Sequence, residues 1–231
     1  MKKRVFNPSG CPVPPFPYSL VVKAGPLVFS SGQLATDFKS GIAAEAAVDP
    51  RRPFAAPYAI TRQTRYIFLN LARLLEAAGA TLDDMVRIEQ FVLDRADAPA
   101  YFSARNEFLV TDRPTSSMLV GHALEVPAAR IILDGIAVAR QEGWAKETFT
   151  TDKVPVNVRA GYSLGQRVGP LVFLPGNTAS DFTTGIHPDA RVDHTFWFER
   201  DITKQTEFIL KTRRVVLEEM GLGLGDVVQA T

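Results

Sequence analysis

Ser116 and His122 are of the residue types that form a nucleophile and its base. They are six residues apart in an apolar stretch that predicts a strand, so both side chains would lie on one face. At about 3.3 Å per residue they would be about 20 Å apart, far beyond hydrogen-bond distance. A serine–histidine pair within the strand is therefore excluded, and one formed across subunits stays open. Ser116 is otherwise a cleft-lining hydroxyl or an ordinary strand serine, and His122 is a packed or rim histidine or a ligand contact.

A second group has the residue types of a metal site: His187, Asp189, Asp193 and His194. It contains no His-x-x-x-His pattern and no cysteine pair, so a solvated loop is the preferred interpretation and no metal is expected. The segment "GLGLGD" at 221–226 is similar to a phosphate-binding loop. It follows a predicted helix instead of joining a strand to one, so we interpret it as a turn.

Composition narrows the classes of function. The 26 basic and 25 acidic residues give a net charge of +1 and are well mixed, so no basic surface for nucleic acid is expected. The single Cys11 excludes an internal disulfide. The initial "MKKR" is not followed by an apolar segment, and no apolar run approaches the roughly 20 residues that a membrane helix needs. These features predict a soluble cytoplasmic protein without a membrane or nucleic-acid partner.

Two parts of the chain carry closely similar sequences. The segment "PYSLVVKAGPLVF" at 17–29 aligns without a gap with "GYSLGQRVGPLVF" at 161–173. Residues 60–86 align in the same way with 202–228. A repeat of this length is a complete small domain rather than a solenoid unit. We therefore predict a tandem duplication, with an N-terminal domain at 1–141 and the first half of a second domain at 142–231.

Hydrophobic periodicity predicts the elements of the first copy. An apolar stripe over 60–78, ended by Gly79, is typical of a helix, and Gly25-Pro26 is typical of the turn of a hairpin. The predicted elements, in order, are strands at 18–24 and 27–31, a helix at 60–78, a strand at 85–93, a helix at 97–110, and strands at 116–124 and 130–139. This β-β-α-β-α-β-β order predicts an α+β domain with both helices on one face of a sheet.

The second copy and the N-terminus leave alternatives open. Thr231 would lie inside the strand equivalent to 85–93, so the second copy is incomplete. Either the sequence is part of a longer chain, or a separate chain completes the second domain. The Pro-rich segment at 7–17 predicts an extended arm, which either packs along a neighbouring subunit or is disordered. In the second copy, Arg213 replaces Leu71 and breaks the helical stripe.

These residues resemble the Rid family, also called the YjgF family, of reactive-intermediate deaminases. The resemblance is carried by "GPLVFSSGQL", "LLEAAGATLDDMV", "FVLD" and "RPTSSMLVGHALEVPAARIILDGIAVA". It covers 17–140 in full and 161–231 in part. The resemblance implies a chorismate-mutase-like α+β domain and a trimer-like homo-oligomer with small-molecule sites between subunits. It also implies hydrolysis of imines or enamines to ketones and ammonia without a cofactor.

The resemblance also suggests site residues. Ser116 stands where deaminating members carry a carboxylate-binding arginine, whose planar fork a serine cannot replace. Asp134 matches the acidic residue thought to orient the attacking water, and is one methylene shorter. The residues at the remaining matched positions are expected to contact substrate: Tyr18, Ser31, Gly32 and Gln33 in the first copy, and Tyr162 and Asn177, of Pro175-Gly176-Asn177, in the second. Asp37, His122 and Glu125 are added as further candidates for substrate contact.

The sequence thus predicts a cofactor-free hydrolase or deaminase of a small activated imine, enamine or amide-like metabolite, in a catabolic role. Asp134 would handle the proton, with Ser116 and Tyr18 beside it. Loss of the arginine predicts a substrate other than a simple 2-imino acid. The alternative is a non-catalytic protein that binds a small ligand or serves as a scaffold. RNA cleavage is disfavoured by the neutral charge and the absence of a basic aromatic surface.

Overall fold

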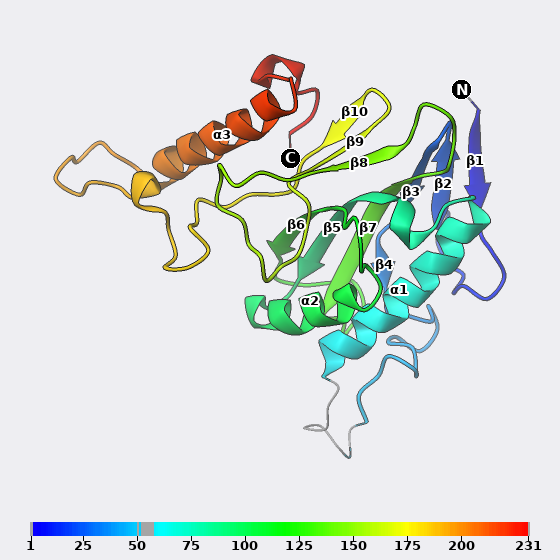
Figure 1. Ribbon diagram of the computed structural model, residues 1–231. Coiled ribbons are helices and arrows are strands. Elements are labelled where there is room, and N and C mark those ends of the chain that lie inside the picture. Colours follow the sequence, from blue (N-terminus) through cyan, green and yellow to red (C-terminus); the bar gives the residue numbers. More distant parts are fainter. Residues whose placement is uncertain (1, 50, 52–57, 231) are drawn as a thin grey trace.

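The computed structural model describes residues 2–49, 51 and 58–230 (Figure 1). Ten strands are formed in this part of the chain: β1 (Lys3–Phe6), β2 (Val21–Ala24), β3 (Leu27–Ser30), β4 (Gln33–Leu34), β5 (Met85–Val92), β6 (Thr115–Val120), β7 (Ile131–Val138), β8 (Lys146–Phe149), β9 (Gly165–Val168) and β10 (Leu171–Phe173). The described helices longer than a single turn are α1 (Ala59–Ala77), α2 (Ala98–Asn106) and α3 (Asp201–Glu219). The elements predicted for the first copy are present in the predicted order, and β1 and β4 are formed in addition.

The first sheet has the order β1-β2-β3-β7-β5-β6, with the short β4 also paired to β7. All its pairs are antiparallel except β5 with β6. The turn between β2 and β3 needs the positive φ of 60° that Gly25 adopts, and Pro26 supplies its fixed φ. Helices α1 and α2 cover one face of this sheet (Figure 1).

Helix α1 forms because its apolar residues recur at helical spacing. Ile67, Leu71 and Leu74 are fully buried against the sheet, and Gly79, at φ 81°, ends the helix in the left-handed region. Phe68 stacks on Phe108 beyond α2, with ring centroids 5.3 Å apart. The stripe predicted from the sequence is therefore the face that forms the core.

A second sheet, of order β10-β9-β8, covers the opposite face of the first (Figure 1). Val168, Leu171 and Phe173 of this sheet pack against Val86 and Ile136 of the first. Helix α3 covers the far side of the second sheet, where Val216 and Met220 join Leu164 in a small core. The described part of the chain thus has the layer order helices, sheet, sheet, helix.

The structure bears on one prediction near each end of the chain. The arm at 7–17 packs on its own chain, since Cys11 is buried and its thiol lies 4.0 Å from the carbonyl of Asn70 in α1. Val13 and Phe16 of the same segment are exposed, so its packing along a neighbouring subunit stays a prediction. The strand predicted at the end of the second copy is not formed over 227–230. Its equivalent, β5, lies between β7 and β6, and the described second sheet offers no such pair of partners.

Candidate functional site

A row of polar side chains crosses the first sheet on the face turned away from α1 and α2. Asp134 of β7 lies opposite Glu89 of β5, and Glu89 lies opposite Ser117 of β6. Successive strand residues point to alternate faces, and the intervening positions Leu133 and Ile88 are buried toward the helices. Three neighbouring strands therefore place two carboxyl groups and a hydroxyl on one face.

A β-bulge sets the position of a cation beside this row. The register of β5 against β7 shifts between Met85 and Arg87, which inserts Val86 as an extra residue. Arg87 forms an ion pair with Glu89, two residues further along the same face. Their side chains are 22% and 26% exposed, so the pair is only partly screened by water.

The carboxyl group of Asp134 has an altered acidity. Partial burial disfavours its charged form, and the negative charge of Glu89 acts in the same direction. Arg87 opposes them more weakly, and the net effect raises the pKa of Asp134 to about 6. A carboxyl group with such a pKa can both donate and accept a proton near neutral pH.

The turn at 31–33 lies at one end of this row. A Cβ added to Gly32 would lie 2.7 Å from the Cδ1 atom of Ile132, which is on the same face as Asp134 and two residues before it. The polar atoms of the turn are used within it. The hydroxyl of Ser31 donates to the carbonyl of Leu20 at 3.2 Å, and the amide of Gln33 donates to the carbonyl of Ser31 at 3.0 Å. The backbone of this turn therefore lies next to the row of polar side chains, while the side chains of the turn bond within it.

Tyr18 forms a separate small cluster. Its side chain is partly exposed and meets Phe38 edge-to-face, with ring centroids 6.4 Å apart. Burial raises the pKa of the Tyr18 hydroxyl, and the charge of Glu125 adds to this effect. The charge of Glu125 thus acts on Tyr18, and both residues were named from the sequence.

Asp37 and His122 show no such grouping. The carboxylate of Asp37 accepts from the backbone of Lys39 and Ser40 and from the Ser40 hydroxyl, which lowers its pKa to about 2. It therefore stabilises its own turn. His122 is exposed in the loop after β6.

Ser116 lies on the face opposite to Asp134, under α2. Its hydroxyl accepts from the Nε2 atom of Gln90 at 2.9 Å and faces the guanidinium of Arg105 at 3.4 Å. Arg105 is 1% exposed and also donates to the carbonyls of Ala160 and Gly161. The hydroxyl that shares the face of Asp134 is therefore that of the next residue along, which the sequence analysis did not select.

The chain beyond the first sheet contacts the row at its other end. The backbone N–H of Gly176 donates to the carbonyl of Ser116 at 3.1 Å and to the hydroxyl of Ser117 at 2.8 Å. Asn177, which follows, bonds the backbone of Thr178. The segment 175–177 is thus docked on the edge strand β6, next to the hydroxyl of the row.

Tyr162 lies further from the row, in the small core beneath α3. Burial raises its pKa, and the charge of Arg213 opposes this effect. Arg213 in turn donates to the carbonyl of Gly176 at 3.2 Å. The residue that breaks the helical stripe therefore links α3 to the segment docked on β6.

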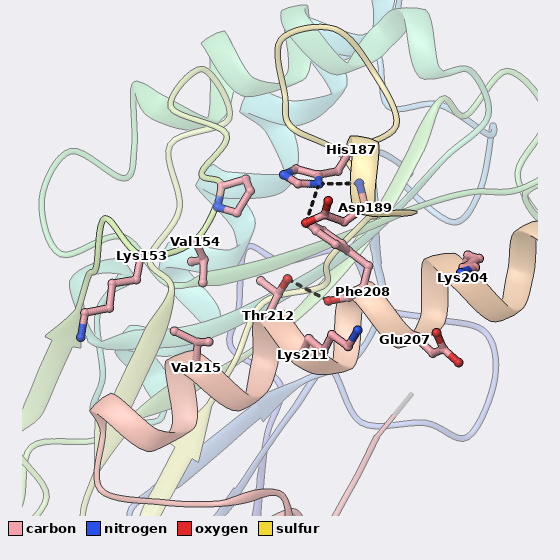
Figure 2. A pocket seen from close by; sticks show the side chains of 11 residues that line it. Lys153, Val154, His187, Asp189, Lys204, Glu207, Phe208, Lys211, Thr212 and Val215 are labelled. Carbon is pink, nitrogen blue, oxygen red and sulfur yellow. Dashed lines mark hydrogen bonds and ion pairs between the residues drawn. The ribbon is translucent and has the colours of Figure 1, made fainter. Parts of the chain in front are cut away.

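Figure 2 shows a cavity of about 380 Å³ between α3 and the loops near Val154 and His187. The ring of His187 stacks on Phe208 at 4.5 Å, and its Nδ1 atom accepts from the backbone of Asp189 at 3.2 Å. None of the residues of the polar row lines this cavity. The described residues contain no group of three possible metal ligands. Among them, too, no helix combines the length and apolar character needed to span a bilayer.

Curated proteins with similar sequences include two named deaminases. The chain is 29% identical over 136 residues to the 2-iminobutanoate/2-iminopropanoate deaminase of Dermatophagoides farinae, which covers 59% of this chain and 96% of that protein. It is also 29% identical over 116 residues to the 3-aminoacrylate deaminase RutC of Acinetobacter baylyi, covering 49% and 81% respectively.

Solved structures show the same fold. Yeast YEO7 covers 60% of this chain and 100% of its own, with a TM-score of 0.51 and 19% identity. YyfA of Yersinia pestis, from the conserved Rid family, covers 59% and 99%, with a TM-score of 0.50 and 21% identity. The family model described as endoribonuclease L-PSP matches residues 11–139, more than half of the chain. The chain therefore belongs to the endoribonuclease L-PSP family, the Rid or YjgF family that its motifs resemble.

Proposed function

We propose that this protein is a hydrolase that releases ammonia from a small activated imine, enamine or amide-like compound, without a cofactor. The carrying observation is Asp134, a half-buried carboxyl group opposite a second carboxyl, with a pKa of about 6. The deaminases among its relatives support this reaction class.

One carboxyl group suffices for the proton transfers. Protonated Asp134 gives its proton to the imine nitrogen and then, as a carboxylate, takes a proton from water while the hydroxide adds to the imine carbon. The carbinolamine so formed receives the proton on nitrogen, and the C–N bond breaks to release ammonia. The remaining hydroxyl proton returns to Asp134, which leaves the ketone and the starting state of the enzyme.

Substrate choice follows from the missing arginine. Ser116 stands at the position of the family's carboxylate-binding residue, lies on the helix-covered face and is bonded to Gln90. We propose that the substrate carries no carboxylate next to its C=N bond, since the guanidinium beside Ser116, that of Arg105, is buried and already donates to the carbonyls of Ala160 and Gly161.

A panel of substrates tests both proposals. Purified protein is supplied with imines of 2-oxo acids and, in parallel, with imines of uncharged ketones, and ammonia release is followed. Faster turnover of the uncharged imines is expected. Turnover of the carboxylated imines alone would contradict the proposed specificity. Turnover of neither would contradict the hydrolase and favour the non-catalytic ligand-binding alternative.

We further propose that residues 142–231 are a partial second copy of the domain at 1–141. The order β8, β9, β10, α3 matches β1, β2, β3, α1, which supports this division. The bridges Thr36↔Ile42 and Ser180↔Ile186 occupy equivalent positions as well.

Unequal burial in the two helices supports a partner for the second copy. Ile60 and Phe68 of α1 are 2% and 0% exposed, whereas their counterparts Ile202 and Leu210 of α3 are 71% and 49% exposed. We propose that another chain, in a trimer-like homo-oligomer or as a separate completing chain, covers this face. Exposed apolar surface of this kind is typical of an interface.

Native mass spectrometry tests this proposal. The protein is expected to form species heavier than the 25.3 kDa chain. The change Leu210→Glu should reduce them to the single chain, because a buried carboxylate is costly. Lys211→Glu, at an exposed position on a different face of α3, is the control and should leave the assembly intact. A single chain in the unmodified protein would contradict the proposed partner.

A further inference from the structure

Glu89 and Asp134 occupy directly opposite positions in an antiparallel pair of strands. At such positions the Cβ atoms are about 4.5–5.5 Å apart, close enough for the two side chains to interact. Two carboxylates at this spacing repel one another, and the repulsion is relieved when one of them takes up a proton. The negative charge of Glu89 therefore disfavours a second negative charge on Asp134.

The surroundings decide which member of the pair holds the proton. Glu89 is ion-paired with Arg87, which favours its charged form. On the other side of Asp134, β4 and β3 place uncharged residues, with Leu34 opposite Ile132 and Phe29 opposite Ile136.

In the second sheet, the ammonium of Lys146 on β8 donates to the carbonyls of Met85 and Asp112. Leu171 and Phe173 bring apolar side chains against the neighbouring Ile136. Arg167 of β9 points away, toward the end of α3, where it donates to the carbonyl of Met220. The charged groups that act on Asp134 are thus Glu89 and Arg87.

We infer that Glu89 is a positioning residue of the site: ionised by Arg87, it keeps the single proton of the carboxyl pair on Asp134. The effect of Glu89 on Asp134 does not depend on the proposed function. The inference rests on the proposed function only where Asp134 transfers its proton to substrate. Without Glu89, burial alone would raise the pKa of Asp134, so a smaller fraction of Asp134 would be protonated at neutral pH and able to give a proton. Glu89 acts through Asp134 and need not touch substrate.

The test compares Glu89→Gln and Glu89→Asp with the unmodified protein. The carboxyl carbon of Asp134 is followed by NMR against pH, with its signal assigned from its loss in Asp134→Asn. Ammonia release is measured over the same pH range with the substrate that the panel above identifies. Glu76→Gln, which removes the same charge from an exposed position of α1, is the matched control.

In Glu89→Gln the pKa of Asp134 should fall by about one unit, which reduces its protonated fraction at pH 7 about tenfold. The fall in activity at high pH should then begin at a pH about one unit lower. Glu89→Asp keeps the charge, so most of the rise in the pKa of Asp134 should remain. In the control Glu76→Gln the pKa of Asp134 should be unchanged. An Asp134 titration unchanged in Glu89→Gln would overturn the inference. A lowered pKa without any change in the rate profile would support the pair and contradict the use of Asp134 in the proposed reaction.

Discussion

Changing Asp134 to asparagine is expected to slow ammonia release by 100-fold or more. Asparagine fills nearly the same space in β7 but has no acidic proton, so each of the proton transfers loses its carrier. General acid–base groups typically contribute 10²–10⁴-fold to a rate. Initial rates with the preferred imine measure the effect, and Asp152→Asn, at an exposed position of a loop, is the control. A rate within threefold of the unmodified protein would contradict the role of Asp134.

The same variant has an effect on stability that does not depend on any substrate. The pKa of Asp134 is about 6 in the folded protein, against an ordinary value of 3.8 for an aspartate side chain. The folded state therefore binds this proton more tightly, and its contribution to stability is present below about pH 4 and is lost as the pH rises through 6. Asparagine cannot ionise, so the variant has no such contribution to lose. From pH 4 to pH 7, the free energy of unfolding of the unmodified protein should therefore fall by about 2 kcal/mol relative to that of the variant. Urea unfolding at pH 4 and pH 7 measures the difference, and parallel pH dependences would contradict it.

Replacement of Arg105 by methionine is expected to lower the free energy of unfolding by about 3 kcal/mol. The Arg105 guanidinium is almost fully buried and donates to the carbonyls of Ala160 and Gly161, which belong to the segment leading into the second sheet. Methionine fills the space beside Tyr101 and Phe102 but removes the cation that faces their rings and leaves these carbonyls without a donor. Unsatisfied buried polar groups cost about 1–3 kcal/mol each.

Arg65→Met provides a matched control for that measurement. Arg65 forms a two-pronged ion pair with Glu107, but both side chains are more than 40% exposed. Exposed ion pairs contribute about 0–1 kcal/mol, so the control should change little. Equal losses in the two variants would show that the buried contacts of Arg105 contribute no more than a surface pair.

Local patterns predicted the elements but not the face on which each polar residue lies. The stripe of α1 and the left-handed Gly79 follow from short-range periodicity and capping, and both are as expected. The strand that contains Ser116 and Ser117 has no clear alternation, so the sequence could not tell which hydroxyl faces the helices. Pairing with β5 decides it.

The carboxyl pair was missed for a related reason. Glu89 meets Asp134 only because the bulge at Val86 and two long connections fix the register of β5 against β7. No local signal in "VRIEQFVL" marks Glu89 as different from a surface residue. Strands β1, β4 and β8 were missed because each is short and lacks the apolar run that marks β2 and β3.

The covering of the first sheet by β9 and β10 affects how this protein can change by mutation. Where identical subunits pack in a symmetric ring, a single substitution alters every copy of the interface at once. Here Val86 and Ile136 contact Val168, Leu171 and Phe173 of the same chain. The two sides of this interface are therefore encoded by different codons. Each side can vary alone, and the surroundings of Asp134 can be adjusted from across the interface without any change in the strand that carries it.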